Sequence, residues 1–227
     1  MSIKLKFFGS SNNSAIVKQA LIQAGYTLVG QLDKADLVIS ADYGQKLPAG
    51  GLNLHPSLLP KYRGPTPVPY QILNQEKQAG ISIIKMTGRF DAGPLIAQES
   101  VPILPNDTSP ELLTRCFSAG AKLLIKILPD YLNNKITQKN QTESQATFTR
   151  KFTKADGFIA WGKYLSSRQS ADLGRRLRAL YPWPGVWTTL PDKKILKLLP
   201  NNQIQLEGKA PISWKQFLAG HQHLLNQ

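Results

Sequence analysis

Apolar and polar residues follow two repeating patterns in the first 135 residues. Alternating or continuously apolar stretches predict β-strands at residues 3–9, 26–32, 35–41, 50–56, 79–87 and 93–103. Apolar residues at helical spacing predict helices at residues 11–26, 66–77 and 109–134. Strands that alternate with helices indicate an α/β protein with an open, largely parallel sheet.

The pattern changes after the third predicted helix. A polar run without hydrophobic periodicity, NNKITQKNQTESQ, follows it and is typical of a linker. Beyond it we expect a helix ended by prolines and three short strands, at residues 166–185, 186–190, 194–199 and 203–207. The sequence therefore predicts a main domain, a linker and a reduced C-terminal domain, at residues 1–135, 136–150 and 151–227.

Composition narrows the class of protein. Hydrophobic residues make up 41% of the chain, and no apolar run approaches the ~18 residues of a membrane span. The first residues, MSIKLKFFGS, lack the apolar stretch of a signal peptide. The single cysteine, Cys116, excludes an internal disulfide and fits a reducing compartment. We therefore expect a cytoplasmic protein with no membrane partner.

Charge is large and unevenly distributed. The net charge is +14, of which residues 1–110 carry +3 and residues 111–227 carry +11. A basic half suggests a polyanionic partner, with nucleic acid ahead of a membrane surface. Charge alone leaves a solvated basic surface as an equal alternative.

Three polar residues near strand ends could carry chemistry. Asn53 and His55 stand two apart, so both face one side of an extended strand, and Asp91 follows the end of ISIIKM. If those strands are neighbours, the side chains meet at one rim of the sheet, where α/β proteins bind ligands. An amide, an imidazole and a carboxylate together suit acyl-type transfer. The amide and the imidazole can donate to an oxyanion, and the imidazole and the carboxylate can move a proton. Spacing alone leaves a structural histidine as the alternative.

The motifs around this trio resemble a known family. NLHPSLLPKYRG followed by GISIIKMTGRFDAGPLI resembles the signature of the folate-dependent formyltransferases, which use 10-formyltetrahydrofolate as formyl donor. The resemblance covers almost the whole chain. It implies a Rossmann-like formyltransferase sheet, a catalytic role for Asn53, His55 and Asp91, and a cis peptide bond before Pro60.

Further segments indicate the branch of the family. YRGPTPVPYQILNQEKQAGISIIKM, ATFTRKFTKADGFIAW, RALYPWPGVWTTL and GKAPISWKQFLAG resemble the methionyl-tRNA formyltransferases more than the glycinamide ribonucleotide enzymes. The resemblance implies formyl transfer to the α-amino group of methionyl initiator tRNA by direct amine attack. Asn53 and His55 would then stabilise the oxyanion and Asp91 would assist proton transfer. Sugar-nucleotide N-formyltransferases, which act on an amino sugar, remain the alternative, and an RNA-binding relative without activity is a third.

The same resemblance implies where the donor binds. The folate would lie between the loops DYGQKLP and TGRFDAG, with contacts from Gln45, Lys46, Leu47, Gly88, Arg89 and Phe90. Lys46 departs from the family, which usually has an apolar residue there. No metal is expected.

Basic residues are the candidates for binding tRNA. Lys61 and Arg63 are expected at the mouth of the site, where a phosphate could lie. A second group could form a phosphate-tracking stripe: Arg175, Arg176, Arg178, Lys193, Lys194 and Lys197. Trp183 and Trp187 are interpreted as aromatics that pack between domains, with platforms for base stacking as the alternative.

Two regions depart from the family pattern. Between YTLVG and DKADLVISA only a few residues remain where relatives usually have a strand, a helix and a long basic loop. The C-terminal region has too few strands to close the five-stranded OB-like barrel of the family. We therefore expect a shortened member with a small, truncated OB-like β appendage, and we favour a monomer.

Overall fold

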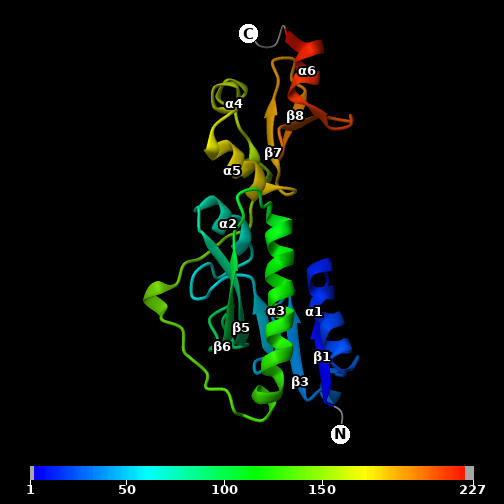
Figure 1. Ribbon diagram of the computed structural model, residues 1–227, viewed down its shortest axis with the longest axis vertical. Helices are drawn as coiled ribbons and strands as arrows, with labels where there is room; N and C mark the ends of the chain where they lie inside the picture. Colours follow the sequence, from blue (N-terminus) through cyan, green and yellow to red (C-terminus); the bar gives the residue numbers. More distant parts are fainter. Residues whose placement is uncertain (1–2, 223–227) are drawn as a thin grey trace.

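The computed structural model describes residues 3–222, so the outermost residues of the two predicted domains lie outside the described part. Figure 1 shows an elongated molecule, with a helix-covered sheet at one end and a smaller sheet at the other. A long segment after the longest helix runs back along the side of the first sheet (Figure 1). The elements that build the site are therefore described from the first sheet outward.

The first sheet has six strands in the order β2-β1-β3-β4-β5-β6. They are β1 (Lys4–Phe8), β2 (Thr27–Leu28), β3 (Leu37–Ala41), β4 (Leu52–His55), β5 (Gln78–Lys85) and β6 (Leu95–Pro102). The pairs β2–β1, β1–β3 and β3–β4 are parallel, whereas β4–β5 and β5–β6 are antiparallel. The prediction of an open, largely parallel α/β sheet is confirmed.

Strand β2 is much shorter than the predicted strand at residues 26–32. Only Thr27 and Leu28 pair with β1. Because β2 and β3 both run parallel to β1, the chain must return from the end of β2 to the start of β3, and only residues 29–36 are available for this crossover. A parallel crossover usually takes a dozen or more residues, so β2 ends early and a short 3₁₀ turn, η1 (Leu32–Lys34), leads into β3.

Helices α1 (Asn12–Gln23) and α3 (Ser109–Leu132) pack side by side against the sheet (Figure 1). Helix α3 begins with a capping box in which Thr108 and Glu111 bond each other's backbone N–H, and Pro110 occupies its first turn. Its inward face buries Phe117, Leu124 and Leu128 completely. These side chains form the main core with apolar residues of α1, β1, β3, β4 and β5.

The C-terminal part has its own core and its own sheet. Its helices are α4 (Trp161–Ser167), α5 (Ala171–Leu180) and α6 (Trp214–His221). Its strands are β7 (Val186–Thr189), β8 (Ile195–Leu199), β9 (Gln203–Leu206) and β10 (Ile212–Ser213), in the antiparallel order β10-β9-β8-β7. The strand β10 was not predicted. The order is open at both ends, so within the described residues this sheet does not close into a barrel, as expected for a truncated appendage.

Helix α2 (Pro67–Leu73) joins the two parts. It packs against α5, and Val68, Ile72 and Ala179 share a small buried cluster. The Ser109 hydroxyl at the start of α3 donates to the Ala179 carbonyl over 2.6 Å. The C-terminal part is thus fixed over the end of the first part at which α2 and α3 begin.

The predicted linker is bound along the first sheet. Lys139 exchanges both backbone hydrogen bonds with Leu95 at the start of β6, over 2.8 and 2.9 Å. The Arg63 N–H donates to Thr147 O over 2.9 Å, and the Thr149 N–H donates to Arg63 O over 2.7 Å. We call residues 139–149, which include the short 3₁₀ turn η2 (Glu143–Gln145), the strap. A third 3₁₀ turn, η3 (Lys154–Gly157), follows it.

Candidate active site

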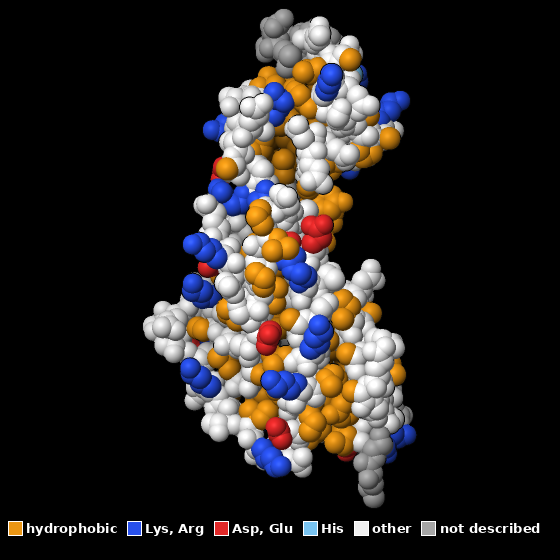
Figure 2. Space-filling model, viewed as in Figure 1, with side chains coloured by type: hydrophobic (Ala, Val, Ile, Leu, Met, Phe, Trp, Pro, Cys, Tyr) orange, Lys and Arg blue, Asp and Glu red, His pale blue; other side chains and the backbone are white. Residues whose placement is uncertain are grey.

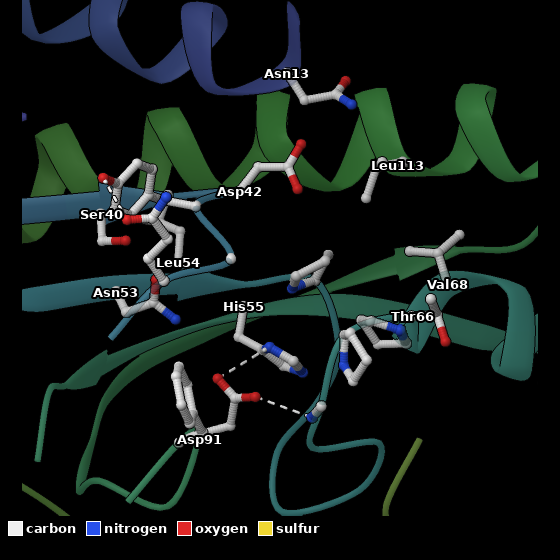
Figure 3. Close-up of a pocket in the computed structure, with 18 of the residues that line it drawn as sticks. Asn13, Ser40, Asp42, Asn53, Leu54, His55, Thr66, Val68, Asp91 and Leu113 are labelled. Atoms are coloured by element: carbon white, nitrogen blue, oxygen red, sulfur yellow. Dashed lines mark hydrogen bonds and ion pairs between the residues drawn. The ribbon is translucent and has the colours of Figure 1, made fainter. Parts of the chain in front are cut away.

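The three candidate catalytic residues line one cavity of about 780 Å³. The cavity lies where β3 and β4 end and where α1, α2 and α3 begin, so side chains of all these elements reach it (Figure 3). Asn53 and His55 point into it from β4, and Asp91 enters from the loop after β5 (Figure 3). The sequence therefore predicted correctly that the trio meets at one rim of the sheet.

The strand that precedes Asp91 runs in a different direction from the one expected for a parallel sheet. Strand β5 is a neighbour of β4 but runs antiparallel to it, with Asn53 opposite Ile84 and Leu52 opposite Lys85. The end of β5 therefore lies beside the start of β4, and the following loop must turn back to reach His55. Two backbone features allow this: Asp91 has a φ of 51°, and a Cβ on Gly93 would lie 1.8 Å from the Lys85 carbonyl oxygen.

His55 is held at both ring nitrogens. Its Nε2 lies 2.8 Å from the Tyr62 carbonyl oxygen, and its Nδ1 lies 3.3 Å from Asp91 Oδ1. A carbonyl oxygen only accepts hydrogen bonds, so Nε2 carries a proton in this arrangement. The residue is only 4% exposed, so these two contacts fix the orientation of a buried ring at the cavity wall.

Asp91 keeps a depressed pKa despite its burial. Burial is the largest influence and raises the pKa, but the His55 hydrogen bond and charge, the Gly64 N–H and the charge of Arg63 together lower it below its ordinary value. The Gly64 N–H donates to Asp91 Oδ2 over 2.9 Å, so both carboxylate oxygens have a partner. Asp91 is therefore an ionised group beside the His55 ring at neutral pH.

The Asn53 carboxamide differs from its two neighbours. It faces the cavity from the same side of β4 as His55 (Figure 3). Among the residues that the structure describes, none is a hydrogen-bond partner of this side chain. Its N–H groups are available to a ligand in the cavity, as an oxyanion donor requires.

All six predicted donor-binding residues line the same cavity. Gln45, Lys46 and Leu47 form one wall, and Gly88, Arg89 and Phe90 form another. The Phe90 side chain is 63% exposed, so its ring stands free at the edge of the cavity. Both loops of the expected donor site therefore line the same cavity as the trio, and what they bind stays a prediction.

Arg63 was predicted at the mouth of the site, but the structure buries it to 1% exposure. Its guanidinium donates to Gln141 Oε1 over 2.8 and 3.1 Å and to Glu143 over 3.0 Å at each carboxylate oxygen. A buried cation needs such partners, so its N–H groups are not available to a phosphate. The expectation for Arg63 is therefore wrong in its placement.

Gln141 and Glu143 are site residues that the sequence analysis missed. Gln141 also donates through Nε2 to the carbonyl oxygens of Asp91 and Gly93, over 2.8 and 2.7 Å. Glu143 accepts a further bond from Arg89 over 3.2 Å. The strap therefore holds the loop that carries Asp91. Both residues lie in a polar run without periodicity, which gave no signal for such a role.

The other predicted basic residues have mixed surroundings. Lys61 is exposed and lies 3.5 Å from Glu76. The Arg176 guanidinium donates to the Asp156 and Phe158 carbonyls, and Arg175 pairs with Asp172 over 2.7 Å.

The remaining members of the predicted stripe differ in exposure and in partners. Arg178 has a buried Nε without a partner among the described residues, Lys194 pairs with Asp192 over 2.9 Å, and Lys193 and Lys197 are exposed. Figure 2 shows Lys and Arg side chains scattered over both parts of the viewed face. The stripe stays a prediction, and the Arg176 Nη2 within it already donates to two backbone carbonyls.

The cavity has a further wall that the sequence analysis did not assign. It is built from the start of α3, the turn after α5 and the chain after the strap, through Pro110, Leu113, Lys151 and residues 181–183. Trp183 in this wall is 64% exposed, so its interpretation as a packing residue is wrong. Trp187, in contrast, packs against Phe158 with ring centroids 4.8 Å apart.

Two kinds of feature are absent from residues 3–222. No group of three or more potential ligand side chains that could hold a metal ion occurs among these residues. No helix in this range is long and apolar enough to cross a membrane.

Sequence comparison identifies relatives along most of the chain. Residues 15–128 match the formyl transferase family. The chain is 32% identical to a methionyl-tRNA formyltransferase of Dehalococcoides mccartyi, over 84% of this chain and 72% of the relative. It is 38% identical to a methionyl-tRNA formyltransferase of Roseiflexus castenholzii, over 69% of this chain and 51% of the relative, so it spans only about half the length of several matched relatives.

Solved structures share the fold at low sequence identity. HypX from Aquifex aeolicus in complex with tetrahydrofolic acid has a TM-score of 0.71 and 15% identity, over 96% of this chain and 47% of that chain. A sugar N-formyltransferase from a Shewanella species has a TM-score of 0.67 and 20% identity, over 87% of this chain and 96% of that chain. Together with the cavity and its trio, the sequence matches establish that the chain belongs to the formyl transferase family, among relatives of the methionyl-tRNA formyltransferases.

Proposed function

We propose that the protein transfers a formyl group from 10-formyltetrahydrofolate to the α-amino group of methionyl initiator tRNA. The observation that carries this proposal is the trio in one cavity. The Asn53 amide, which has no partner among residues 3–222, lies next to His55, whose Nδ1 is 3.3 Å from the ionised Asp91. These groups stabilise negative charge on an oxygen and remove a proton from nitrogen, which are the two needs of amine formylation.

Each member of the trio has its own part in this reaction. Asn53 donates to the formyl oxygen, where negative charge develops as the acceptor nitrogen adds to the formyl carbon. His55 is the second donor once its Nε2 releases the Tyr62 carbonyl, which holds it over 2.8 Å. Asp91, as an ionised carboxylate, keeps the ring oriented and draws the proton away from the acceptor amine through water. The proton finally reaches the nitrogen that loses the formyl group.

The donor side of the proposal rests on the two loops. The cavity of about 780 Å³ has the size of a site for a small organic molecule, and it is lined mainly by apolar groups with a few polar ones. A planar pterin fits between Gln45–Leu47 and Gly88–Phe90, where backbone groups and the exposed Phe90 ring are available. HypX, which shares the fold, was solved with tetrahydrofolic acid.

The acceptor side rests on the relatives and on charge. Curated relatives that match in sequence include methionyl-tRNA formyltransferases, and the net charge of +14 favours a nucleic-acid acceptor. An amino sugar on a nucleotide is the second candidate. It is favoured by the fold of the sugar N-formyltransferase, which this chain matches over 96% of that protein.

A single assay distinguishes these acceptors. The protein is incubated with formyl-labelled 10-formyltetrahydrofolate and either methionyl initiator tRNA or a dTDP-linked amino sugar. The variant Asn53→Ala/Asp91→Asn is the matched negative control. Label on methionine recovered from the tRNA, absent with the control, supports the proposal. Label on the sugar alone selects the second candidate, and tRNA binding without label on either acceptor refutes enzymatic function.

A further inference from the structure

Exposed aromatic side chains gather at the edge of the active-site cavity. Among the described residues, Phe90, Tyr181 and Trp183 are large apolar side chains that are 63%, 38% and 64% exposed, and all three line this cavity. Phe90 belongs to the proposed donor side. Tyr181 and Trp183 belong to the turn after α5, to which the proposed function assigns no ligand.

The turn that carries Trp183 is anchored at both ends. Leu180 and Val186 are 2% and 1% exposed, and the Gly185 N–H donates to Leu180 O over 2.9 Å. The chain at Gly157 lies so close beneath it that a Cβ there would come within 1.9 Å of the Gly185 carbonyl oxygen. Trp183 is therefore presented to solvent by a fixed turn, and little conformational freedom is left to lose on binding.

A cation lies in the same wall. Lys151 lines the cavity, and among the described residues it has no acidic partner. The neighbouring Arg150 differs, because its guanidinium is held by Asp156. An exposed aromatic surface beside an unpaired ammonium suits a nucleobase with its phosphate.

Deeper in the cavity the wall becomes aliphatic. Val68 is 1% exposed, and Leu113 and Pro110 lie at the start of α3 beside it. Figure 3 shows Val68 and Leu113 facing the same side of the cavity, on the far side of His55 from Asn53. An aliphatic side chain attached to the reacting amine can lie here, while a planar ring extends outward to Trp183.

We infer that Tyr181 and Trp183 bind the terminal nucleobase of the acceptor by stacking, with Lys151 at its phosphate. The inference rests on the proposed function and adds the part of the acceptor that is recognised: an aminoacylated terminal adenosine. Stacking of one base on an aromatic side chain changes affinity roughly 5- to 150-fold.

Two small acceptors test this directly. One is 3′-O-methionyl-adenosine 5′-phosphate, and the other is the same molecule with hydrogen in place of adenine. For the unmodified protein we expect KM for the first to be roughly 5- to 150-fold lower, with similar kcat. Trp183→Ala should remove this difference, Trp183→Phe should keep most of it, and Ile22→Ala, which changes an exposed apolar residue outside the cavity, should leave it unchanged. An equal KM for the two acceptors, or a Trp183→Ala variant that keeps the preference, overturns the inference while formyl transfer still stands.

A binding measurement makes the result independent of activity. Calorimetry gives the Kd of 3′-(N-acetylmethionyl)amino-3′-deoxyadenosine 5′-phosphate, which has no free amine to react. Weaker binding to Trp183→Ala by the same factor supports the inference even if no acceptor is formylated, in which case only the proposed function fails. Binding that depends on Trp183 for dTDP but not for the adenosine compound overturns the assignment to adenosine. Because Trp183 is 64% exposed, its variants should keep the melting temperature of the unmodified protein. If Trp183→Ala lowers the melting temperature, the inference is judged on Trp183→Phe, which should keep most of the preference for the adenosine compound.

Discussion

At the scale of single residues, Asp91 shows how the site keeps a charge that burial opposes. Burial raises its pKa, and three kinds of partner lower it again: the His55 ring, the Gly64 N–H and the charge of Arg63. The net direction is downward, so the folded protein holds Asp91 ionised at a pH where an unfolded chain would protonate it. The ionised Asp91 that the proposed reaction uses therefore also stabilises the folded protein, and this contribution is lost in acid.

The unfolding free energy should therefore fall as pH is lowered through the acid range. Unfolded Asp91 binds its proton near the ordinary value of about 3.9, whereas native Asp91 binds it at a lower pH. Its contribution is present above pH 4 and is lost below it. Urea unfolding between pH 6 and pH 3 should show a smaller loss of stability in Asp91→Asn than in the unmodified protein. An identical pH profile in the variant would contradict the depressed pKa of Asp91.

Asn53 carries the sharpest prediction for rate. If its free amide is the oxyanion donor, Asn53→Ala should lower kcat by about 10²–10³, because one donor of this kind is worth that factor. Donor affinity and melting temperature should change little, since the side chain has no partner among the described residues. Single-turnover kinetics with the proposed acceptor measure the rate, and calorimetry of tetrahydrofolate measures the donor affinity. A fall confined to donor affinity would assign Asn53 to binding instead.

At the scale of elements, the strap completes the site from outside the sheet. Its Gln141 bonds Arg63 and the carbonyls of Asp91 and Gly93, and its Glu143 bonds Arg63 and Arg89. Two loops that line the cavity are therefore cross-linked by one segment. The position of Asp91 relative to His55 depends on this segment as well as on β4 and β5.

Replacing Gln141 should test this dependence. Gln141→Ala leaves the Arg63 guanidinium and two carbonyls short of a partner, so we expect a loss of about 1–3 kcal/mol in unfolding free energy. We also expect a lower kcat with little change in KM, because Asp91 is no longer fixed. Gln145→Ala, an exposed amide on the same strap, is the matched control. Urea unfolding and steady-state kinetics measure the two effects, and equal behaviour of the two variants would refute a positioning role.

The sequence was sufficient for elements with a clear pattern and for residues within a motif. The strands around Asn53 and His55 have strong apolar periodicity, and the cis bond between Leu59 and Pro60 agrees with the motif. Antiparallel β5 was not foreseen, because periodicity does not give strand direction. The bonds from Arg63 to Gln141 and Glu143 join residues 78 and 80 positions apart, and no local pattern reports such pairs. Exposure of Trp183 likewise depends on how the turn is anchored by Gly157, far along the chain.

At the scale of the whole molecule, the charge is spread over two parts that meet near the active site. Exposed cations such as Lys193 and Lys194 lie on the C-terminal part, whereas Arg176 is used to hold that part together. Only the exposed cations could contact phosphates of a tRNA acceptor directly. The number of arginines and lysines in the sequence therefore overstates the number of phosphates that can be bound.

Salt dependence measures this number. If methionyl-tRNA is bound, the logarithm of the association constant should fall linearly with the logarithm of salt concentration. Lys193→Ala/Lys194→Ala should reduce the slope by about one for each lysine that contacts a phosphate. Lys126→Ala, an exposed charge near the end of α3, is the matched control. Filter binding over a range of KCl concentrations gives the slopes, and an unchanged slope in the double variant would exclude this turn from the tRNA contact.

The burial of Arg63 has a consequence for the order in which the protein can mature. A ribosome releases Arg63 about 80 residues before Glu143. Until then, a nascent chain that has already formed its sheet must either leave this guanidinium hydrated or enclose a cation that lacks its counter-charge. The active site can therefore be completed only late in synthesis. A chain that ends at residue 135 would retain the sheet but would lack the strap that bonds Arg63 and the loop of Asp91.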